Sequence, residues 1–269
     1  MDKIAYVVNS TPKYFYLLDA HFGMYRRYAS ALSWPVYFAT EVPDHPMVQS
    51  IVKKYKVQLL VLPKEESDFL ESRAAVLKLL PESVKYVMMA QEDFLLERPG
   101  PDITELEKIV AVMEEDTSLV SARLMPCPGP AVVDAGGPCE SWAYLDENHD
   151  AYMFTFQATL WKRAELQSFY EMVLHYVQNQ VGGTYRKNSV EYNKYQVNQN
   201  PAEMVLGKKA YHAVLSGKKH AAYIRKGGWS NAVYLCPWPY RPTAIVKGVL
   251  GKWAEELVLR EGFSCVKDT

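Results

Sequence analysis

The sequence has few cysteines, and none of them falls in a metal-binding or disulfide pattern. Cys127, Cys139, Cys236 and Cys265 are scattered, with no CxxC pair and no cysteine–histidine pair at zinc-ligand spacing. A chain of 269 residues can build a core without the disulfide framework that small secreted domains need. We therefore expect four free thiols in a reducing compartment.

Long hydrophobic runs, a leader pattern and excess charge are also missing. No apolar run approaches the roughly 20 residues that a membrane-spanning helix needs. The first ten residues, MDKIAYVVNS, enter a strand-like stretch without the charged and apolar regions of a signal peptide. The formal net charge of −1 gives the chain as a whole no attraction to nucleic acid or to anionic membrane. We expect a soluble, cytoplasmic protein with no nucleic-acid partner and no membrane span.

Three common motifs of α/β enzymes are absent. Without GxxxxGK[ST], a P-loop nucleoside triphosphatase is disfavoured, and without GxGxxG after the first strand, so is a dinucleotide-binding fold. The absence of GxSxG likewise disfavours an α/β-hydrolase.

What the first hundred residues do contain is an alternation of strand-like and helix-like stretches. Short, near-continuous apolar runs predict strands buried on both faces, as in parallel sheets covered by helices. The stretches between them carry apolar residues at helical spacing. The predicted strands are 4–10, 34–41, 57–63 and 85–90, and the predicted helices are 14–30, 45–56 and 66–81. This order indicates a doubly wound α/β sheet.

The rest of the chain continues the pattern less regularly. A helix is expected at 102–116, with Asp102 as its N-cap and Glu105 at the capping-box position. A Pro-, Gly- and acid-rich segment at 127–150 reads as a long loop with room for a short hairpin. The other expected elements are strands at 118–126, 151–163 and 220–228 and helices at 164–180, 201–217 and 243–260.

Two adjacent acids, Glu92 and Asp93, come shortly after the strand that ends at Ala90. Ligands of open α/β sheets bind beyond the carboxyl ends of the strands, and carboxylates there can hold a divalent cation. The alternative is an Asp that caps a turn before the next apolar run. Pattern alone leaves both interpretations open.

Three segments together resemble glycosyltransferases of the GT-A fold: SRAAVLKLLPESVKYVMMAQEDFLL at 72–96, FTFQATLWKRAEL at 154–166 and NPAEMVLGKKA at 200–210. The resemblance covers roughly residues 3–230. It implies one domain over 1–269 with a Rossmann-like, mostly parallel sheet flanked by helices. Residues 1–100 would bind the nucleotide-sugar, and residues 101–269 would form the acceptor half and C-terminal tail. The implied partners are a nucleoside-diphosphate-sugar donor, with UDP-sugar favoured, and a glycan or glycoprotein acceptor.

The resemblance also assigns donor-binding residues. The end of the first strand would hold the nucleotide base and ribose, and an arginine in the helix before the acids would contact the diphosphate. The acids stand where the family carries a DxD motif that binds Mn²⁺ or Mg²⁺; Gln91 replaces the first carboxylate, which leaves Asp93 as the main protein contact to a metal. The donor residues implied are Asn9, Ser10, Thr11, Arg73, Gln91, Glu92 and Asp93.

Glu203 matches the family's catalytic base. A carboxylate within hydrogen-bond reach of an acceptor hydroxyl takes its proton as the new bond forms, which implies an inverting displacement. The structural alternative is that Glu203 complements a helix dipole in a first turn.

Five more residues are implied on the acceptor side and at the metal. Gln157, Trp161 and Asp134 would contact the acceptor or the donor sugar, and His212 or His220 would complete the coordination of the metal. For Trp161 the alternative is a core position, and lone histidines are more often structural or exposed.

Two other functions stay open. A nucleotidyltransferase shares nucleotide-binding α/β architecture, although the segment VVNSTPKYFYL at 7–17, which spans the end of the first strand, lacks the glycine-rich basic loop usual in that class. A non-catalytic carbohydrate- or nucleotide-binding protein with a degenerate GT-A fold is the second alternative.

Overall fold

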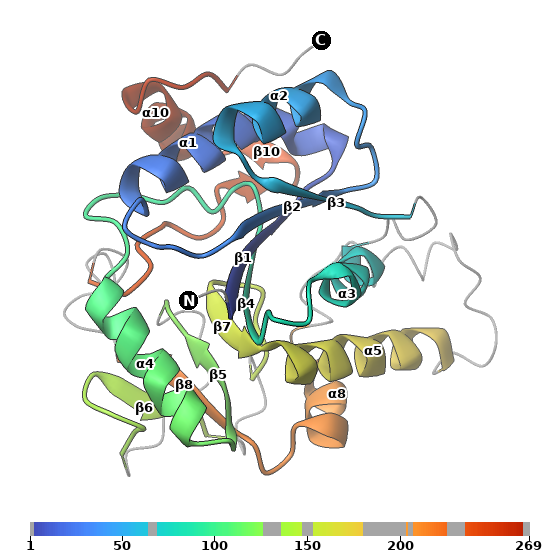
Figure 1. The fold of residues 1–269 in the computed structure, drawn as a ribbon, viewed down its shortest axis with the longest axis vertical. Coiled ribbons are helices and arrows are strands. Elements are labelled where there is room, and N and C mark those ends of the chain that lie inside the picture. The colour runs from blue at the N-terminus through green and yellow to red at the C-terminus, as the bar shows by residue number, and fades with distance from the viewer. Residues whose placement is uncertain are drawn as a thin grey trace.

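The fold is built on an eight-stranded sheet (Figure 1). The computed structural model describes residues 3–63, 69–125, 136–146, 153–179, 203, 207–224 and 235–265. The strands lie in the order β3-β2-β1-β4-β7-β5-β8-β6. Pairing is parallel except at β7, which is antiparallel to β4 and β5, and at β6, which is antiparallel to β8. The predicted α/β class with a mostly parallel sheet flanked by helices is confirmed.

The strands form where the apolar runs predicted them, with two differences. Their bounds are β1 Ile4–Asn9, β2 Val36–Thr40, β3 Gln58–Val61, β4 Tyr86–Ala90, β5 Leu119–Arg123, β6 Trp142–Tyr144, β7 Thr159–Lys162 and β8 Lys219–Tyr223. Every residue of β1, β2, β4 and β5 is buried, which explains their continuous apolar sequence. β6 arises inside the predicted loop 127–150, and β7 occupies only the end of the predicted strand 151–163.

Helices cover both faces of the sheet (Figure 1). On one face lie α1 Leu18–Tyr28, α2 Pro46–Tyr55 and α4 Ile103–Glu115, and on the other α3 Phe69–Leu79, α5 Arg163–Asn179 and α8 Gly207–Val214. A short 3-10 helix, η1 (Pro12–Leu17), joins β1 to α1. Helix α4 buries one side, formed by Leu106, Ile109 and Met113 at three-and-four spacing, whereas α1 and α3 bury nearly every residue along most of their length.

At the start of α4, the predicted N-cap Asp102 is confirmed, but the predicted capping box with Glu105 is only half formed. Asp102 accepts a hydrogen bond from the Glu105 backbone N–H at 3.1 Å, as an N-cap does. The reciprocal half of the capping box is not made. The Asp102 N–H instead donates to the Pro237 carbonyl, and the Glu105 carboxylate accepts from the Trp142 indole at 2.9 Å.

The C-terminal segment differs from the single helix predicted at 243–260. It first forms the hairpin β9 (Ile245–Val246) and β10 (Val249–Leu250), and only then α10 (Lys252–Arg260). The helix cannot begin earlier because the chain reverses at Lys247 and Gly248, whose φ values are 50° and 81°. The hairpin and α10 pack with η1 and α1 in a third apolar cluster.

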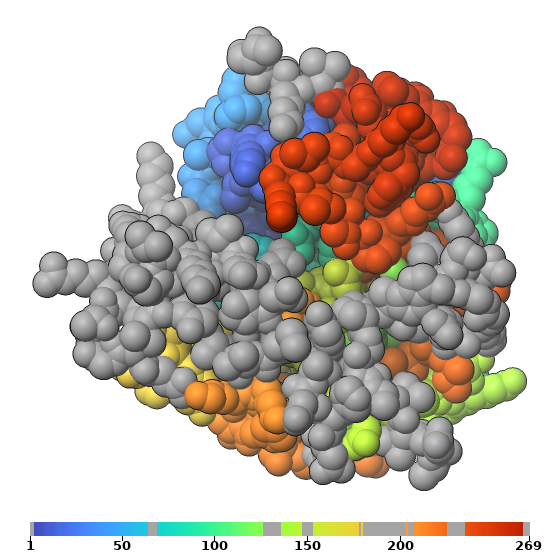
Figure 2. All heavy atoms as spheres, turned by 180° about the vertical axis from the view of Figure 1, so that it is seen from behind, coloured from blue at the N-terminus to red at the C-terminus, as the bar shows by residue number. Residues whose placement is uncertain are grey.

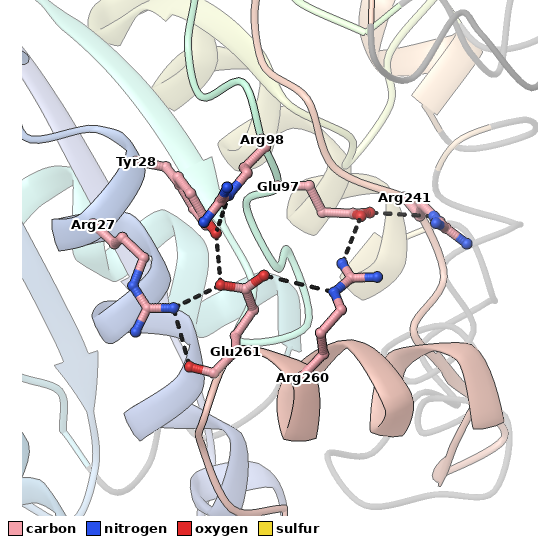
Figure 3. A network of polar contacts seen from close by, with 7 residues as sticks. All are labelled: Arg27, Tyr28, Glu97, Arg98, Arg241, Arg260 and Glu261. Atoms are coloured by element: carbon pink, nitrogen blue, oxygen red, sulfur yellow. Dashed lines mark hydrogen bonds and ion pairs between the residues drawn. The ribbon is translucent and has the colours of Figure 1, made fainter.

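A polar network ties α10 to the segment after β4 and to α1. Its members are Arg27, Tyr28, Glu97, Arg98, Arg241, Arg260 and Glu261 (Figure 3). Glu97, which is 4% exposed, pairs with Arg241 at 3.2 Å and with Arg260 at 3.8 Å. Glu261 accepts from the Tyr28 hydroxyl at 2.6 Å. The C-terminal region is therefore fixed beside the residues that come after the acid pair.

Two further expectations concern thiols and membrane spans. Cys139, Cys236 and Cys265 are free, and Cys127 lies outside the described residues. Within the described part of the chain, the helices are too short or too polar to cross a bilayer.

Candidate active site

Most of the predicted site residues lie at one edge of the sheet. β1, β4 and β5 all end there, and β7 begins there because it runs in the opposite direction. The register pairs Val8 with Ala90 and Arg123 with Thr159. The turn after β4 and the residues before β7 therefore lie next to one another, as the rule for open α/β sheets predicts.

The acid pair is buried and incompletely partnered. Glu92 is 5% exposed and Asp93 is 7% exposed. Asp93 Oδ2 accepts a hydrogen bond from the Ile245 N–H at 3.2 Å, whereas its buried Oδ1 has no partner among the described residues. Burial and the charge of Asp93 raise the pKa of Glu92 to about 8, although Ser10 and Arg73 oppose the shift. Two adjacent buried carboxyls with an unpartnered oxygen suit a positively charged ligand.

The backbone of the pair is held from α1 by His21. Its Nδ1 lies 3.1 Å from the Glu92 carbonyl oxygen, and its Nε2 lies 3.0 Å from the Tyr6 hydroxyl. Burial lowers the pKa of His21 to about 4, so the ring is neutral near pH 7. A carbonyl only accepts, so Nδ1 carries the proton and Nε2 accepts from Tyr6. Sequence reasoning did not single out this residue; its only signal is a lone histidine in an apolar helix.

Arg73 is a buried positive charge beside the acids. It is 2% exposed, and its guanidinium carbon lies 4.3 Å from the ring centre of Phe69 and 5.5 Å from that of Phe156. Its Nε has no hydrogen-bond partner among the described residues. Burial lowers the pKa of Arg73, while Tyr170 and the two acids counteract that shift. The predicted direct contact with a diphosphate stays a prediction; in this arrangement Arg73 acts on the acids electrostatically.

Glu203 lies at the same edge, opposite the start of β7. It is 8% exposed, and its Oε1 accepts from the Thr155 hydroxyl and from the Phe156 N–H, both at 2.9 Å. Burial raises the pKa of Glu203, against these two hydrogen bonds and the positive charge of Arg123. A carboxylate whose pKa is raised holds a proton more firmly than an ordinary one, which suits a general base.

Phe156 and Tyr170 link Glu203 to the acid side of the site. The Phe156 N–H binds Glu203 while its ring packs against Arg73. Tyr170 is buried, and that burial raises its pKa to about 12. The charge of Arg73 acts to lower this pKa and the charge of Glu203 acts to raise it, so Tyr170 interacts electrostatically with both residues. A small cavity lined by Arg73, Gln157 and Tyr170, among others, has room for about one water molecule.

Gln157 is held by a residue that sequence reasoning did not single out, Tyr240. The Tyr240 hydroxyl donates to Gln157 Oε1 at 2.6 Å and accepts from the Ala158 N–H at 2.9 Å. Its ring stacks on Phe94, one residue after the acid pair, at 4.6 Å between centroids. Tyr240 thus joins the two strand ends that form the site. Its signal in the sequence is the aromatic run at 229–240.

The predicted base and ribose residues sit at the end of β1. Asn9 is 8% exposed and donates through Nδ2 to the Ala39 carbonyl at 3.3 Å. Ser10 is buried, and Thr11 is exposed at the N-cap of η1. Ser10 lies beside the acid pair, because its side chain acts to lower the pKa of Glu92.

A further buried acid, Glu41, comes directly after β2 at the same edge. It is 7% exposed, and its Oε1 accepts from the Ser72 hydroxyl at 3.2 Å. Burial raises the pKa of Glu41. Its sequence signal, an acid at the end of an apolar strand, is the one that identified Glu92 and Asp93, and sequence reasoning did not extend it to Glu41.

Trp161 and Asp134 are not placed at this edge by the structure. Trp161 is 3% exposed and packs in the core with Phe154 and Phe169, which is the alternative position considered for it. Asp134 lies outside the described residues. Their predicted contacts with a sugar stay predictions.

The predicted metal set of Asp93, His212 and His220 is not assembled. No three His, Cys, Asp or Glu side chains within the described ranges lie close enough together to hold a metal. His220 sits near the start of β8, at the other end of that strand, where its Nδ1 and the Ser121 hydroxyl are 2.7 Å apart. His212 is exposed on α8. His220 is therefore a core residue, and His212 is a surface residue.

Comparisons with known proteins find structural likeness only. No family model and no curated protein matches the sequence. Among solved structures, the chain is similar to CMP:2-keto-3-deoxy-manno-octonic acid synthetase complexed with CTP, at 13% identity and a TM-score of 0.45, covering 82% of this chain and 89% of that one. It is similar to 4-diphosphocytidyl-2C-methyl-D-erythritol synthase from Anaerococcus prevotii, at 10% identity and a TM-score of 0.45, covering 86% and 95%. It is also similar to residues 1–349 of TarS from S. aureus in complex with UDP, at 12% identity and a TM-score of 0.45, covering 84% and 59%.

Proposed function

We propose that the protein is a glycosyltransferase. It moves a sugar from a nucleoside-diphosphate donor, with a UDP-sugar favoured, to a hydroxyl of a glycan or glycoprotein. The observation that carries this proposal is the meeting, at one strand edge, of the acid pair Glu92–Asp93, the cation Arg73 and a third carboxylate, Glu203, whose pKa is raised.

The donor would lie along the ends of β1, β2 and β4. Asn9, Ser10 and Thr11 offer amide, hydroxyl and backbone groups to the nucleoside, and the Glu41 carboxylate can accept hydrogen bonds from ribose hydroxyls. This placement puts the diphosphate next to the acid pair, because Ser10 adjoins Glu92.

The acid pair fits a divalent cation that shares its coordination with the substrate. Asp93 Oδ1 is a buried oxygen without a partner among the described residues, and the raised pKa values of both acids reflect how poorly their charges are compensated. Mg²⁺ and Mn²⁺ are commonly bound by one or two carboxylates plus phosphate oxygens and water. Glu92 and Asp93 would hold such an ion, which neutralises negative charge on the diphosphate when bound.

Glu203 would act as the general base. It takes the proton of the acceptor hydroxyl while the acceptor oxygen bonds to the anomeric carbon and the bond from that carbon to the diphosphate breaks. The nucleoside diphosphate leaves with the bonding electrons, and the anomeric configuration inverts. The positive charge of Arg73 favours the ionised form of the two acids, which is the form that would hold a divalent cation. The same positive charge would attract the negative charge of the departing diphosphate.

A donor panel tests the proposal. The protein is incubated with UDP-, GDP- and dTDP-sugars and Mn²⁺, with and without simple glycan acceptors, and release of nucleoside diphosphate is followed by a coupled assay. We expect slow release from one donor and faster release with an acceptor, and proton NMR of the product should show inversion. Pyrophosphate release from a nucleoside triphosphate and a sugar phosphate would instead identify a nucleotidyltransferase. Binding without turnover would identify a binding protein.

A further inference from the structure

The β9–β10 hairpin exposes apolar side chains that the proposed chemistry does not use. Val246 and Val249 pair directly across the hairpin and are 53% and 68% exposed. Side chains of directly paired residues lie on the same face of a hairpin, so the two valines form one apolar tip. The neighbouring pair, Ile245 and Leu250, packs inward with η1 and α10. The hairpin therefore has an anchored side and an apolar side that is open to solvent.

Lysines surround this tip. Lys247 lies in its turn, and the Lys13 ammonium would be 2.9 Å from a Cβ added at Gly248, so the exposed start of η1 lies against the turn. In Figure 2 the N-terminal segment, in blue, adjoins the C-terminal segment, in red, on one face of the molecule. Lys252 comes just after the hairpin and is 88% exposed, with Glu256 at 3.8 Å.

The two stretches of sequence that form this region contain no acidic residue. Residues 242–254, PTAIVKGVLGKWA, and residues 10–18, STPKYFYLL, contain no Asp or Glu. Neither Lys13 nor Lys247 has an acidic side chain within 4 Å in the described part of the chain. The two stretches carry Lys13, Lys247 and Lys252 and no acid, although the whole chain carries −1; Glu255 and Glu256 follow directly after the second stretch.

We propose that the tip formed by Lys13, Val246, Lys247 and Val249 docks on the surface of an anionic lipid bilayer. Lysines next to exposed aliphatic side chains match the two layers of that surface: phosphate headgroups attract the ammonium groups, and the acyl boundary receives the valines. A free phosphate would use only the lysines, whereas a bilayer surface uses the lysines and the valines together. With two lysines and two valines the attachment is weak and reversible.

Docking through this tip would place the candidate site close to the membrane surface. The inner side of the hairpin donates the Ile245 N–H to Asp93, so the site adjoins the docking surface. An acceptor held at a membrane surface would approach the same edge of the sheet. The inference goes beyond the proposed function and does not depend on it, because the docking surface is defined by exposed residues outside the site.

Sedimentation with vesicles tests the inference without any donor or acceptor. The protein is mixed with phosphatidylcholine vesicles that contain 30% phosphatidylglycerol, at 50 mM and at 500 mM NaCl, and with pure phosphatidylcholine vesicles. We expect partition onto the anionic vesicles at low salt, and little at high salt or on neutral vesicles. The double variant K13Q/K247Q should bind about 25-fold more weakly, at about fivefold for each lysine. The variant V246S/V249S should bind the anionic vesicles about tenfold more weakly.

Matched controls carry the same changes elsewhere on the surface. Lys53→Gln alters an exposed lysine of α2, and Val61→Ser alters a valine of β3 that is 52% exposed. Both should bind within about twofold of the unchanged protein, and thermal melts should show that all four variants are folded. The inference is overturned if the protein ignores anionic vesicles at low salt. It is equally overturned if folded tip variants bind as well as the controls.

Discussion

Replacing Glu203 with Gln removes a base while keeping its shape. The side-chain amide oxygen can still accept from the Thr155 hydroxyl and the Phe156 N–H, so the geometry around Oε1 is preserved. What is lost is the capacity to take a proton. General bases contribute about 10²- to 10⁴-fold to rate, so we expect kcat of E203Q to fall by that factor, with little change in KM for the donor.

The pH profile gives the same prediction a second readout. Because burial raises the pKa of Glu203, kcat/KM of the unchanged enzyme should fall in acid with a midpoint above the ordinary value of 4.5. E203Q should lack this acidic limb. Because the pKa of Glu203 is raised, the contribution of this residue to stability is fully present below pH 4.5 and is lost as the pH rises through its folded-state pKa. Gln cannot ionise, so at pH 8 E203Q should unfold at the same or a higher temperature than the unchanged protein.

The assay follows nucleoside diphosphate release at saturating donor between pH 4.5 and 9, with thermal melts on the same samples. Glu115→Gln, an exposed residue of α4, is the matched control and should retain full rate. A folded E203Q enzyme with an unchanged rate, or with the same acidic limb, would refute the role of Glu203.

Three further predictions concern stability. Burial and the charge of Asp93 raise the pKa of Glu92 to about 8, so the protein should lose stability as the pH rises from 4.5 to 8. E92Q should lose less stability over this range. Melting temperatures of the two proteins that change equally with pH would contradict this prediction. Tyr240→Phe leaves the Ala158 N–H and the Gln157 amide oxygen without their partner and should cost about 1–3 kcal/mol in urea unfolding, so a change below about 0.5 kcal/mol would rule out the observed contacts. Leu257→Ala, in the buried side of α10, should cost about 2–5 kcal/mol, whereas Leu259→Ala on its exposed side should cost less than about 0.5 kcal/mol; equal effects would mean that α10 is packed differently.

The sequence predicted the strands well because β1, β2, β4 and β5 are buried throughout, and continuous apolar runs report burial directly. It could not predict that β7 enters the sheet in the opposite direction, since the direction depends on pairing with β4 and β5 rather than on local pattern. The β9–β10 hairpin is not evident from the sequence because its strands have only two residues each, and because Lys247, unlike Gly248 beside it, is not a typical residue for a turn with positive φ.

The site was predictable where a rule links sequence to position. The rule about strand ends placed Glu92 and Asp93, and it applies equally to Glu41 at the end of β2. His21 and Tyr240 act through partners 71 and 83 residues away, Glu92 and Gln157, so no local pattern could reveal them. The histidines expected at the metal illustrate the converse, since a motif position does not say at which end of its strand a residue lies.

A crystal structure of the protein with Mn²⁺ and the nucleoside diphosphate selected by the donor panel tests the central claim most directly. We expect the diphosphate beside Asp93, the nucleoside along the ends of β1 and β2, and the Glu203 carboxylate facing the position of the sugar. A nucleotide bound elsewhere, with Asp93 still bonded only to the Ile245 amide, would contradict the proposed site.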